Sequence, residues 1–380
     1  MNFSPLSVRS GIVVSLLALC AGCGSRDGVR EYERGCEAYA VRDLAKADRL
    51  LTDSLERSPE DLDRLVTLAQ VKLDLGELTA ARELVTRAEI HAGDGDTDVA
   101  LLAAQIAWHA KDYKAAAAGF SALADNARLE PAVRAQALAG LGVVEMTCDN
   151  YHLARIALLR AIRLDRRHAA AWYHLGLIYQ EFGYLEAALE QFDIFVRLEE
   201  GASPRVQKVQ RSAIPALKES IAQTAAERPG ASRRNSAACS TAIARAEKEL
   251  KKGSAKNARQ AYQEALTADP LSYPAALGLA RAWGRTDKTK TGQTKALECY
   301  QTACALRPSA VSTLLTAGAL ALRLGYPSQA VDIYSRAVAA SPTSLDALDG
   351  LIRALRKCGG KNAVAQAYQL YRESIAAKRK

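Results

Sequence analysis

Residues 171–192 read AWYHLGLIYQEFGYLEAALEQF, and the small residues in this segment decide the fold. Large apolar residues recur in it at the spacing of one helix face. Gly176, Gly183, Ala187 and Ala188 fall between them. Small side chains at fixed points let another helix approach closely. The segment therefore predicts two helices in close contact with each other and with neighbours.

The pattern of residues 171–192 recurs along the chain at intervals near 34 residues. Alanine stands at the position of Ala188 in seven other places: Ala47, Ala81, Ala116, Ala154, Ala258, Ala296 and Ala330. Glycine or alanine stands at the position of Gly176 in Gly35, Ala69, Ala104 and Gly142. Such a period predicts stacked structural repeats, which together bury apolar faces that one repeat cannot bury alone. We expect nine repeats, starting near residues 28, 62, 97, 135, 169, 239, 273, 311 and 345.

The residue types at these positions resemble those of the tetratricopeptide repeat family. The matching residues of the clearest repeat are Trp172, Leu175, Gly176, Tyr179, Ala188 and Phe192, and later repeats end on Pro270, Pro308 and Pro342. The resemblance covers about residues 29 to 376. It implies an all-α fold, an α-solenoid in which antiparallel helix pairs stack into a superhelix.

Spacing also predicts how the chain is divided. Ala188 and Ala258 are 70 residues apart, about two periods, and the pattern fades between them. We expect a first module of about five repeats over residues 31–200 and a second of about four over residues 237–380. Residues 201–236 are either a degenerate repeat or a linker. A longer step locates an insertion at residues 284–295, which we expect to lengthen a turn.

The first residues, MNFSPLSVRSGIVVSLLALCAGCG, have the features of a secretory signal: Arg9, a short apolar run and then small residues. Their end resembles the bacterial lipobox, which implies a signal peptide at residues 1–22, lipid attachment at Cys23 and a tether at residues 23–30. Cys20 stands where leucine is usual in that motif. An ordinary signal peptide and an uncleaved segment are the alternatives. Gly24 after the lipidated cysteine implies the outer membrane of a bacterial envelope, on the side that faces the periplasm.

The formal charge of +9 permits anionic partners. The basic residues are spread over several short clusters, at 228–234, 288–295 and 378–380, and no nucleic-acid motif accompanies them. We therefore expect a solvated basic surface and no nucleic-acid partner, with contact to anionic lipid or glycan as the alternative.

No motif for catalysis, a cofactor or a metal occurs in the sequence. We expect no enzyme activity, no cofactor, no metal and no small-molecule substrate. Six cysteines besides Cys20 and Cys23 are expected to be small core residues: Cys36, Cys148, Cys239, Cys299, Cys304 and Cys358.

In the family that the chain resembles, the first helix of each pair lines a concave groove. The resemblance implies a partner-binding groove made of Tyr32, Tyr39, Val66, Gln70, Leu101, Gln105, Trp108, Val143, Tyr173, Leu177, Gln180, Ile243, Leu277, Arg281, Leu315 and Arg323. Family members that clamp a C-terminal carboxylate carry lysine and asparagine, which are absent from the matching positions here. A groove of this composition suits a segment of another protein.

The predicted function is thus a non-enzymatic interaction scaffold, anchored by lipid in the bacterial envelope. Its partners would be other envelope proteins, in envelope assembly, secretion or pilus biogenesis. The alternatives are an accessory of cell-wall glycan processing and, if the signal is misinterpreted, a soluble intracellular regulator.

Overall fold

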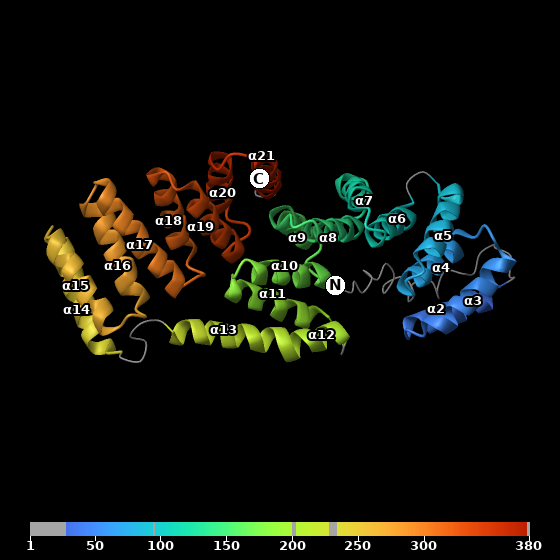
Figure 1. Cartoon of the computed structure of the whole chain (residues 1–380), viewed down its shortest axis with the longest axis horizontal. Helices are drawn as coiled ribbons and strands as arrows, with labels where there is room; N and C mark the ends of the chain where they lie inside the picture. Colours follow the sequence, from blue (N-terminus) through green and yellow to red (C-terminus); the bar gives the residue numbers. More distant parts are fainter. Residues whose placement is uncertain (1–27, 94–95, 200–202, 228–233, 378–380) are drawn as a thin grey trace. The chain divides into compact units, whose positions relative to one another are not determined.

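The computed structural model describes residues 28–93, 96–199, 203–227 and 234–377. In these ranges the chain folds into helices, and consecutive helices pack in pairs (Figure 1). Nine such pairs are present in the described ranges, which confirms the predicted all-α solenoid. Cys23 and the rest of the predicted signal lie outside the described residues.

The chain divides into two compact units, residues 1–171 and 172–380, and the division falls inside α10. It lies earlier than residues 201–236, where the sequence predicts the boundary between modules. The first unit holds α2 (Val29–Ala40), α3 (Leu44–Arg57), α4 (Leu62–Asp74), α5 (Leu78–His91), α6 (Thr97–His109), α7 (Tyr113–Asp125), α8 (Pro131–Thr147), α9 (Tyr151–Leu164) and the start of α10 (Ala169–Glu181).

The second unit continues α10 and contains the remaining helices. They are α11 (Leu185–Leu198), α12 (Pro204–Lys208), the π-helix η1 (Val209–Ala213), α13 (Ile214–Ala226), α14 (Ser236–Lys251), α15 (Ala255–Ala268), α16 (Tyr273–Thr286), α17 (Lys290–Leu306), α18 (Val311–Leu324), α19 (Pro327–Ala340), α20 (Leu345–Lys357) and α21 (Asn362–Ala377).

The small residues lie where helices cross, as the sequence predicts. All eight alanines of the Ala188 position have no exposed surface. A Cβ atom added to Gly176 would lie 2.7 Å from a ring carbon of Phe192, and one added to Gly142 would lie 2.8 Å from the Leu158 side chain. The glycines therefore leave room for a large side chain on the second helix of the same pair.

Most turns within a pair pass through a residue in the left-handed region. Gly183 has φ +69°, which glycine adopts without steric cost. The same conformation follows the first helix of seven other pairs, at Arg42, Gly76, Lys111, Asp149, Gly253, Gly325 and Gly359. This shared turn gives the pairs a common geometry from which a regular stack can grow.

Residues 204–226 form one helical run in place of a helix pair. The run contains a π-turn at Val209–Ala213, in which the Ile214 N–H bonds to the Val209 carbonyl. Pro215 lacks an N–H and crowds the preceding turn, and widening the helix there relieves both defects. α13 packs on α11, as the first helix of a following pair does elsewhere. The run thus caps the fifth pair.

The insertion near residue 290 is helical, so the prediction of a longer turn is wrong. Residues 290–295 form the first turns of α17, which begins after an N-cap at Thr289. α17 has 17 residues, against 14 in α16 and α18. The added length places Gln293 beside α16, where its side chain reaches the Gly284 carbonyl.

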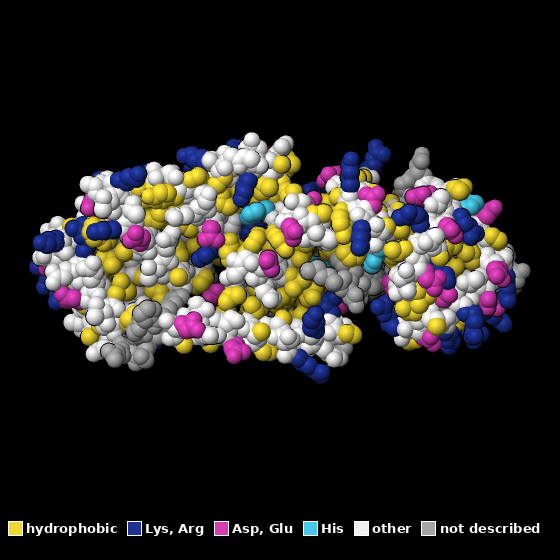
Figure 2. Space-filling model, in the orientation of Figure 1, with side chains coloured by type: hydrophobic (Ala, Val, Ile, Leu, Met, Phe, Trp, Pro, Cys, Tyr) yellow, Lys and Arg dark blue, Asp and Glu magenta, His cyan; other side chains and the backbone are white. Residues whose placement is uncertain are grey.

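On the face drawn in Figure 2, Lys and Arg side chains lie among Asp and Glu over both units. The described residues include no helix that is both long and apolar enough to cross a membrane, and among them no His, Cys, Asp and Glu side chains gather as metal ligands would. Five described cysteines are free: Cys148, Cys239, Cys299, Cys304 and Cys358. Cys239 and Cys304 are buried as expected, but Cys148 is exposed at the end of α8, so the core prediction is wrong for it.

Candidate partner-binding surfaces

Five predicted groove residues are buried in the first unit. Val66 and Gln70 on α4, Leu101 and Gln105 on α6, and Val143 on α8 are each exposed by 7% or less. The first helices of successive pairs pack on one another, α4 on α6 and α6 on α8. These side chains fill that contact, and they offer a partner little surface.

Two aromatic groove residues of the first unit use their polar atoms to join neighbouring pairs. The Tyr32 hydroxyl lies 3.1 Å from Thr67 Oγ1. The Trp108 indole N–H donates to Thr147 Oγ1 at 3.3 Å. Each bond links the first helix of one pair to the first helix of the next, so these side chains support the stack.

A polar cluster around Asp74 engages Tyr39 in the same way. The carboxylate accepts hydrogen bonds from the Tyr39 hydroxyl at 3.0 Å, Arg42 at 2.8 Å and Gln70 at 3.2 Å. Burial raises the pKa of Asp74, and the hydrogen bond from Tyr39 and the charge of Arg42 oppose the rise. Burial also lowers the pKa of the nearby His109. The three donors thus engage the Asp74 carboxylate within the stack, although the side-chain oxygen of Gln70 has no partner among the described residues.

On α10, Tyr173 is half-buried against the second helix of its pair. Its ring centroid lies 5.2 Å from that of Phe195, and the Arg205 guanidinium of α12 stands 5.1 Å from the ring centre. Leu177 is also half-buried, and Gln180 is exposed. The capping helix thus covers part of the surface that the sequence assigns to a partner.

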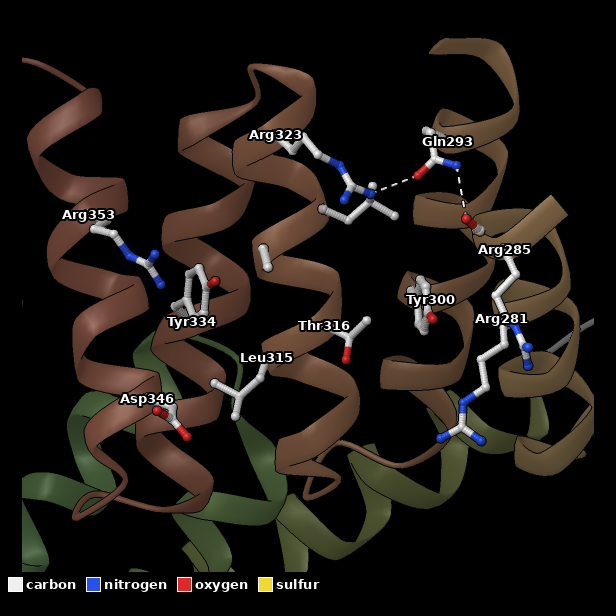
Figure 3. A pocket seen from close by; sticks show the side chains of 13 residues that line it. Arg281, Arg285, Gln293, Tyr300, Leu315, Thr316, Arg323, Tyr334, Asp346 and Arg353 are labelled. Atoms are coloured by element: carbon white, nitrogen blue, oxygen red, sulfur yellow. Dashed lines mark hydrogen bonds between the residues drawn. The ribbon is translucent and has the colours of Figure 1, made fainter. Parts of the chain in front are cut away.

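The second unit contains a cavity of about 880 Å³, lined mainly by the first helices of three successive pairs (Figure 3). The predicted groove residues Arg281, Leu315 and Arg323 line it, from α16 and α18. Ile243 and Leu277, also predicted, are half-buried and do not line this cavity.

The cavity also contains two arginines that the sequence analysis missed. Arg285 lies on α16 and Arg353 on α20. The lining residues thus include four arginines and only one acidic side chain, that of Asp346. A concave wall with charges of one sign concentrates the electric field and attracts the opposite charge.

These arginines differ in what they bind. Arg323 donates to the Gln293 side chain at 2.8 Å, and Arg353 donates to the Asp349 carbonyl of its own helix at 3.3 Å. No described residue forms a hydrogen bond or an ion pair with Arg281 or Arg285. The two side chains of α16 are therefore available to an anion.

The wall of the cavity includes two buried tyrosines. Tyr300 is 7% exposed and Tyr334 is 2% exposed. Burial raises the pKa of both hydroxyls, and the charges of Arg281 and Arg353 respectively oppose the rise. A smaller cavity of about 380 Å³ shares Arg323 and Arg353 with the first and adds Lys357. The basic surface therefore extends along α20.

Comparison with known proteins places family matches along much of the chain. The sequence profile described as Tetratricopeptide repeat matches residues 38–106, and a second profile with the same description matches residues 140–203. A profile described as Bacterial transcriptional activator domain matches residues 291–378. No curated protein sequence matches the chain.

Several solved structures match parts of the chain at low identity. PilF of Pseudomonas aeruginosa is 18% identical, with 54% of this chain and 93% of that chain covered and a TM-score of 0.41. PilW, described as a widely conserved type IV pilus biogenesis factor, is 18% identical, with 54% and 96% covered and a TM-score of 0.42. A MamA fragment from Desulfovibrio magneticus is 17% identical, with 47% and 97% covered and a TM-score of 0.37.

Proposed function

This chain is a tetratricopeptide repeat protein, and on that premise we propose that it is a non-enzymatic scaffold that binds segments of other proteins. The surface we assign to binding is formed by the first helices of its pairs. Within it, the cavity between α16, α18 and α20 is the leading site. The observation that carries the proposal is that three successive pairs contribute accessible side chains to one concave space.

The cavity has the mixed character that protein segments require. Leu315 is half-buried and apolar, Thr316 is exposed and polar, and arginines stand around them. Interfaces commonly combine an apolar anchor with polar side chains that fix orientation. Its volume also suits several side chains of a bound segment.

Photo-crosslinking tests this assignment directly. A photoreactive amino acid at Thr316 in the full chain, expressed in its native host, is expected to capture a reproducible partner. The matched position is Glu298, which is exposed on α17 and does not line the cavity. Equal capture from both positions, or none from either, would contradict the assignment.

We further propose that the protein is anchored by lipid at Cys23 in the bacterial envelope, at the outer membrane facing the periplasm, with other envelope proteins as partners. The support is the sequence of residues 1–24, with its basic, apolar and small-residue regions. Acyl chains stabilise membrane attachment by about 0.8 kcal/mol per buried methylene. Metabolic labelling with a fatty-acid probe is expected to mark the wild type and not the Cys23→Ala variant. An unlabelled wild type would remove the lipoprotein proposal.

A second candidate function is a soluble intracellular regulator. The observation in its favour is the match of residues 291–378, from α17 to α21, to the family described as Bacterial transcriptional activator domain. Cell fractionation separates the two candidates. Recovery of the full chain with the cytosol, together with an absence of fatty-acid label, would favour the regulator.

A further inference from the structure

Basic residues recur at equivalent positions of successive first helices in the second unit. Arg285, Arg323 and Lys357 are 38 and 34 residues apart, the same steps that separate Pro270, Pro308 and Pro342, which precede the three pairs. Arg281 and Arg353 share a second position, one helical turn earlier. All five residues line one of the two adjoining cavities. The stack therefore repeats the positive charge from pair to pair.

On two of these helices the basic residues stand in pairs whose charges repel each other. Arg281 and Arg285 lie one turn apart on α16, and Arg353 and Lys357 lie one turn apart on α20. Like charges at that separation repel and destabilise a helix. Arg285, Arg323 and Lys357 lie in the last turns of their helices, where positive charge is favourable, so part of their recurrence is explained by the helix ends. Arg281 and Arg353 lie one turn earlier, where that effect is weaker.

Asp346 lines the cavity, whereas two other acidic side chains nearby are engaged elsewhere. Asp349 precedes Arg353 by one turn, yet both of its oxygens accept hydrogen bonds from Arg372 of α21, at 2.6 and 3.0 Å. Asp287, after α16, accepts from the Thr289 hydroxyl and N–H. These bonds leave the cavity with its excess of positive charge.

The other lining residues narrow the class of ligand. The rings of Tyr300 and Tyr334 are buried, so they cannot stack on the bases of a nucleic acid. The arginines are exposed, but they line a hollow between helices, which a flat membrane surface does not enter. Leu315 and Thr316 give the hollow apolar and polar contacts that suit a polypeptide.

We propose that this cavity binds an acidic segment of a partner protein, whose side-chain carboxylates pair with Arg281, Arg285 and Arg323. The guanidinium group presents two parallel N–H donors that match a carboxylate. Arg281 and Arg285 supply the unpaired charges, and Arg323 is already oriented by Gln293. This inference rests on the proposed scaffold function and specifies the chemistry of its ligand.

The test uses the full chain and an array of random synthetic peptides tethered through their C-termini, so that only side-chain carboxylates are offered. Wild-type protein is expected to bind peptides enriched in Asp and Glu. The best of these, made in solution with an amidated C-terminus, should lose about tenfold or more of its affinity when Asn and Gln replace Asp and Glu. The Arg281→Gln/Arg285→Gln variant should show a similar loss, and high salt should weaken the wild-type complex.

The matched control is the Arg49→Gln/Arg82→Gln variant, which removes the same charge from exposed positions of the first unit. It should bind as the wild type does. Binding without acidic enrichment, or enrichment that survives in Arg281→Gln/Arg285→Gln, would overturn the acidic ligand but leave the scaffold function intact. Arginine-dependent binding of duplex DNA in preference to every array peptide would also overturn it. If no peptide binds, the acidic ligand is overturned, and crosslinking at Thr316 decides the scaffold function separately.

Discussion

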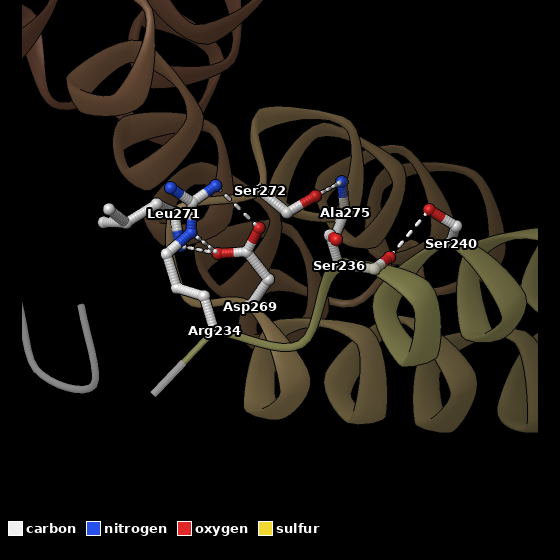
Figure 4. A network of polar contacts seen from close by, with 7 residues as sticks. All are labelled: Arg234, Ser236, Ser240, Asp269, Leu271, Ser272 and Ala275. Carbon is white, nitrogen blue, oxygen red and sulfur yellow. Dashed lines mark hydrogen bonds and ion pairs between the residues drawn. The ribbon is translucent and has the colours of Figure 1, made fainter. Parts of the chain in front are cut away.

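Arg234 donates two hydrogen bonds to the carboxylate of Asp269, from Nε to Oδ1 at 2.8 Å and from Nη2 to Oδ2 at 3.0 Å (Figure 4). The pair ties the residue before the N-cap of α14 to the residue after α15. The Asn235 N–H also donates to the Ala268 carbonyl. Together these bonds close the start of the sixth helix pair against its own end.

This pair predicts a pH-dependent contribution to stability. The hydrogen bonds from Arg234 lower the pKa of Asp269 below its ordinary value. A lowered acid pKa stabilises the fold above the unfolded pKa of about 3.9, and the contribution is lost as pH falls through the folded pKa. Arg234→Gln should therefore lower the midpoint of thermal unfolding at neutral pH, and its difference from wild type should shrink in acid. Circular dichroism measures both, with Arg49→Gln as the control. A difference that is constant with pH would contradict the prediction.

We expect a substitution of Gly176 to lower the stability of the fold, because its neighbour lies in close contact. An added methyl group would meet the Phe192 ring, which is fully buried and has no space to move into. Gly176→Ala should lower the free energy of unfolding by about 1–3 kcal/mol, measured by urea denaturation. Gly284→Ala is the matched control on α16. Its added Cβ would lie 3.8 Å from Ala296, an ordinary contact, so helix propensity should dominate and stabilise by up to about 1 kcal/mol. A stabilising Gly176→Ala would be incompatible with the packing described.

We expect an apolar residue at the position of Gln105 to stabilise the fold. Both polar atoms of its buried side chain lack a hydrogen-bond partner among the described residues. Replacing an unsatisfied buried amide by an apolar group of similar shape removes a penalty. Gln105→Met should raise the free energy of unfolding by about 1 kcal/mol. Gln70→Met, in contrast, removes a hydrogen bond to Asp74 and should not stabilise. Equal effects of the two substitutions would show that Gln105 has a partner.

We expect the helical run of residues 204–226 to protect the amides of α11 from hydrogen exchange. Leu217 on α13 is 4% exposed, and α13 packs on α11. Leu217→Ala should cost about 2–5 kcal/mol of local stability by leaving a cavity. Hydrogen exchange of the α11 amides should accelerate, whereas exchange in α4 and α5 should stay unchanged. Uniform acceleration over the whole chain would mean that the two units unfold together.

The fold was predictable because the repeat encodes it in small residues. The alanine that recurs from Ala47 to Ala330 is enough to locate the helix pairs in the sequence, and each of these alanines is buried. The insertion at residues 284–295 was misjudged since its Lys, Thr and Gly content suggests a turn. Thr289 instead caps a helix there by accepting a hydrogen bond from the Gly292 N–H. The composition of a short polar segment does not show whether it lengthens a turn or one of the helices beside it.

The candidate site was predictable only in part. Register assigns Arg281, Leu315 and Arg323 to one surface, and all three line one cavity; the same register applied to α16 and α20 would have found Arg285 and Arg353. Burial of Gln70 and Gln105 could not be foreseen. It depends on how closely α4, α6 and α8 approach one another, which spacing along the sequence does not determine.

The recurrence of basic residues on α16, α18 and α20 gives the second unit positive charges at a regular spacing. Each helix offers its charge at one fixed interval along the stack. A ligand whose negative charges repeat at that interval contacts the basic residues of all three helices simultaneously. After the first contact has formed, each later one forms at a high effective concentration. A ligand with equal charge at another interval gains only one contact. Discrimination among partners would then depend on the pitch of their charges more than on their number.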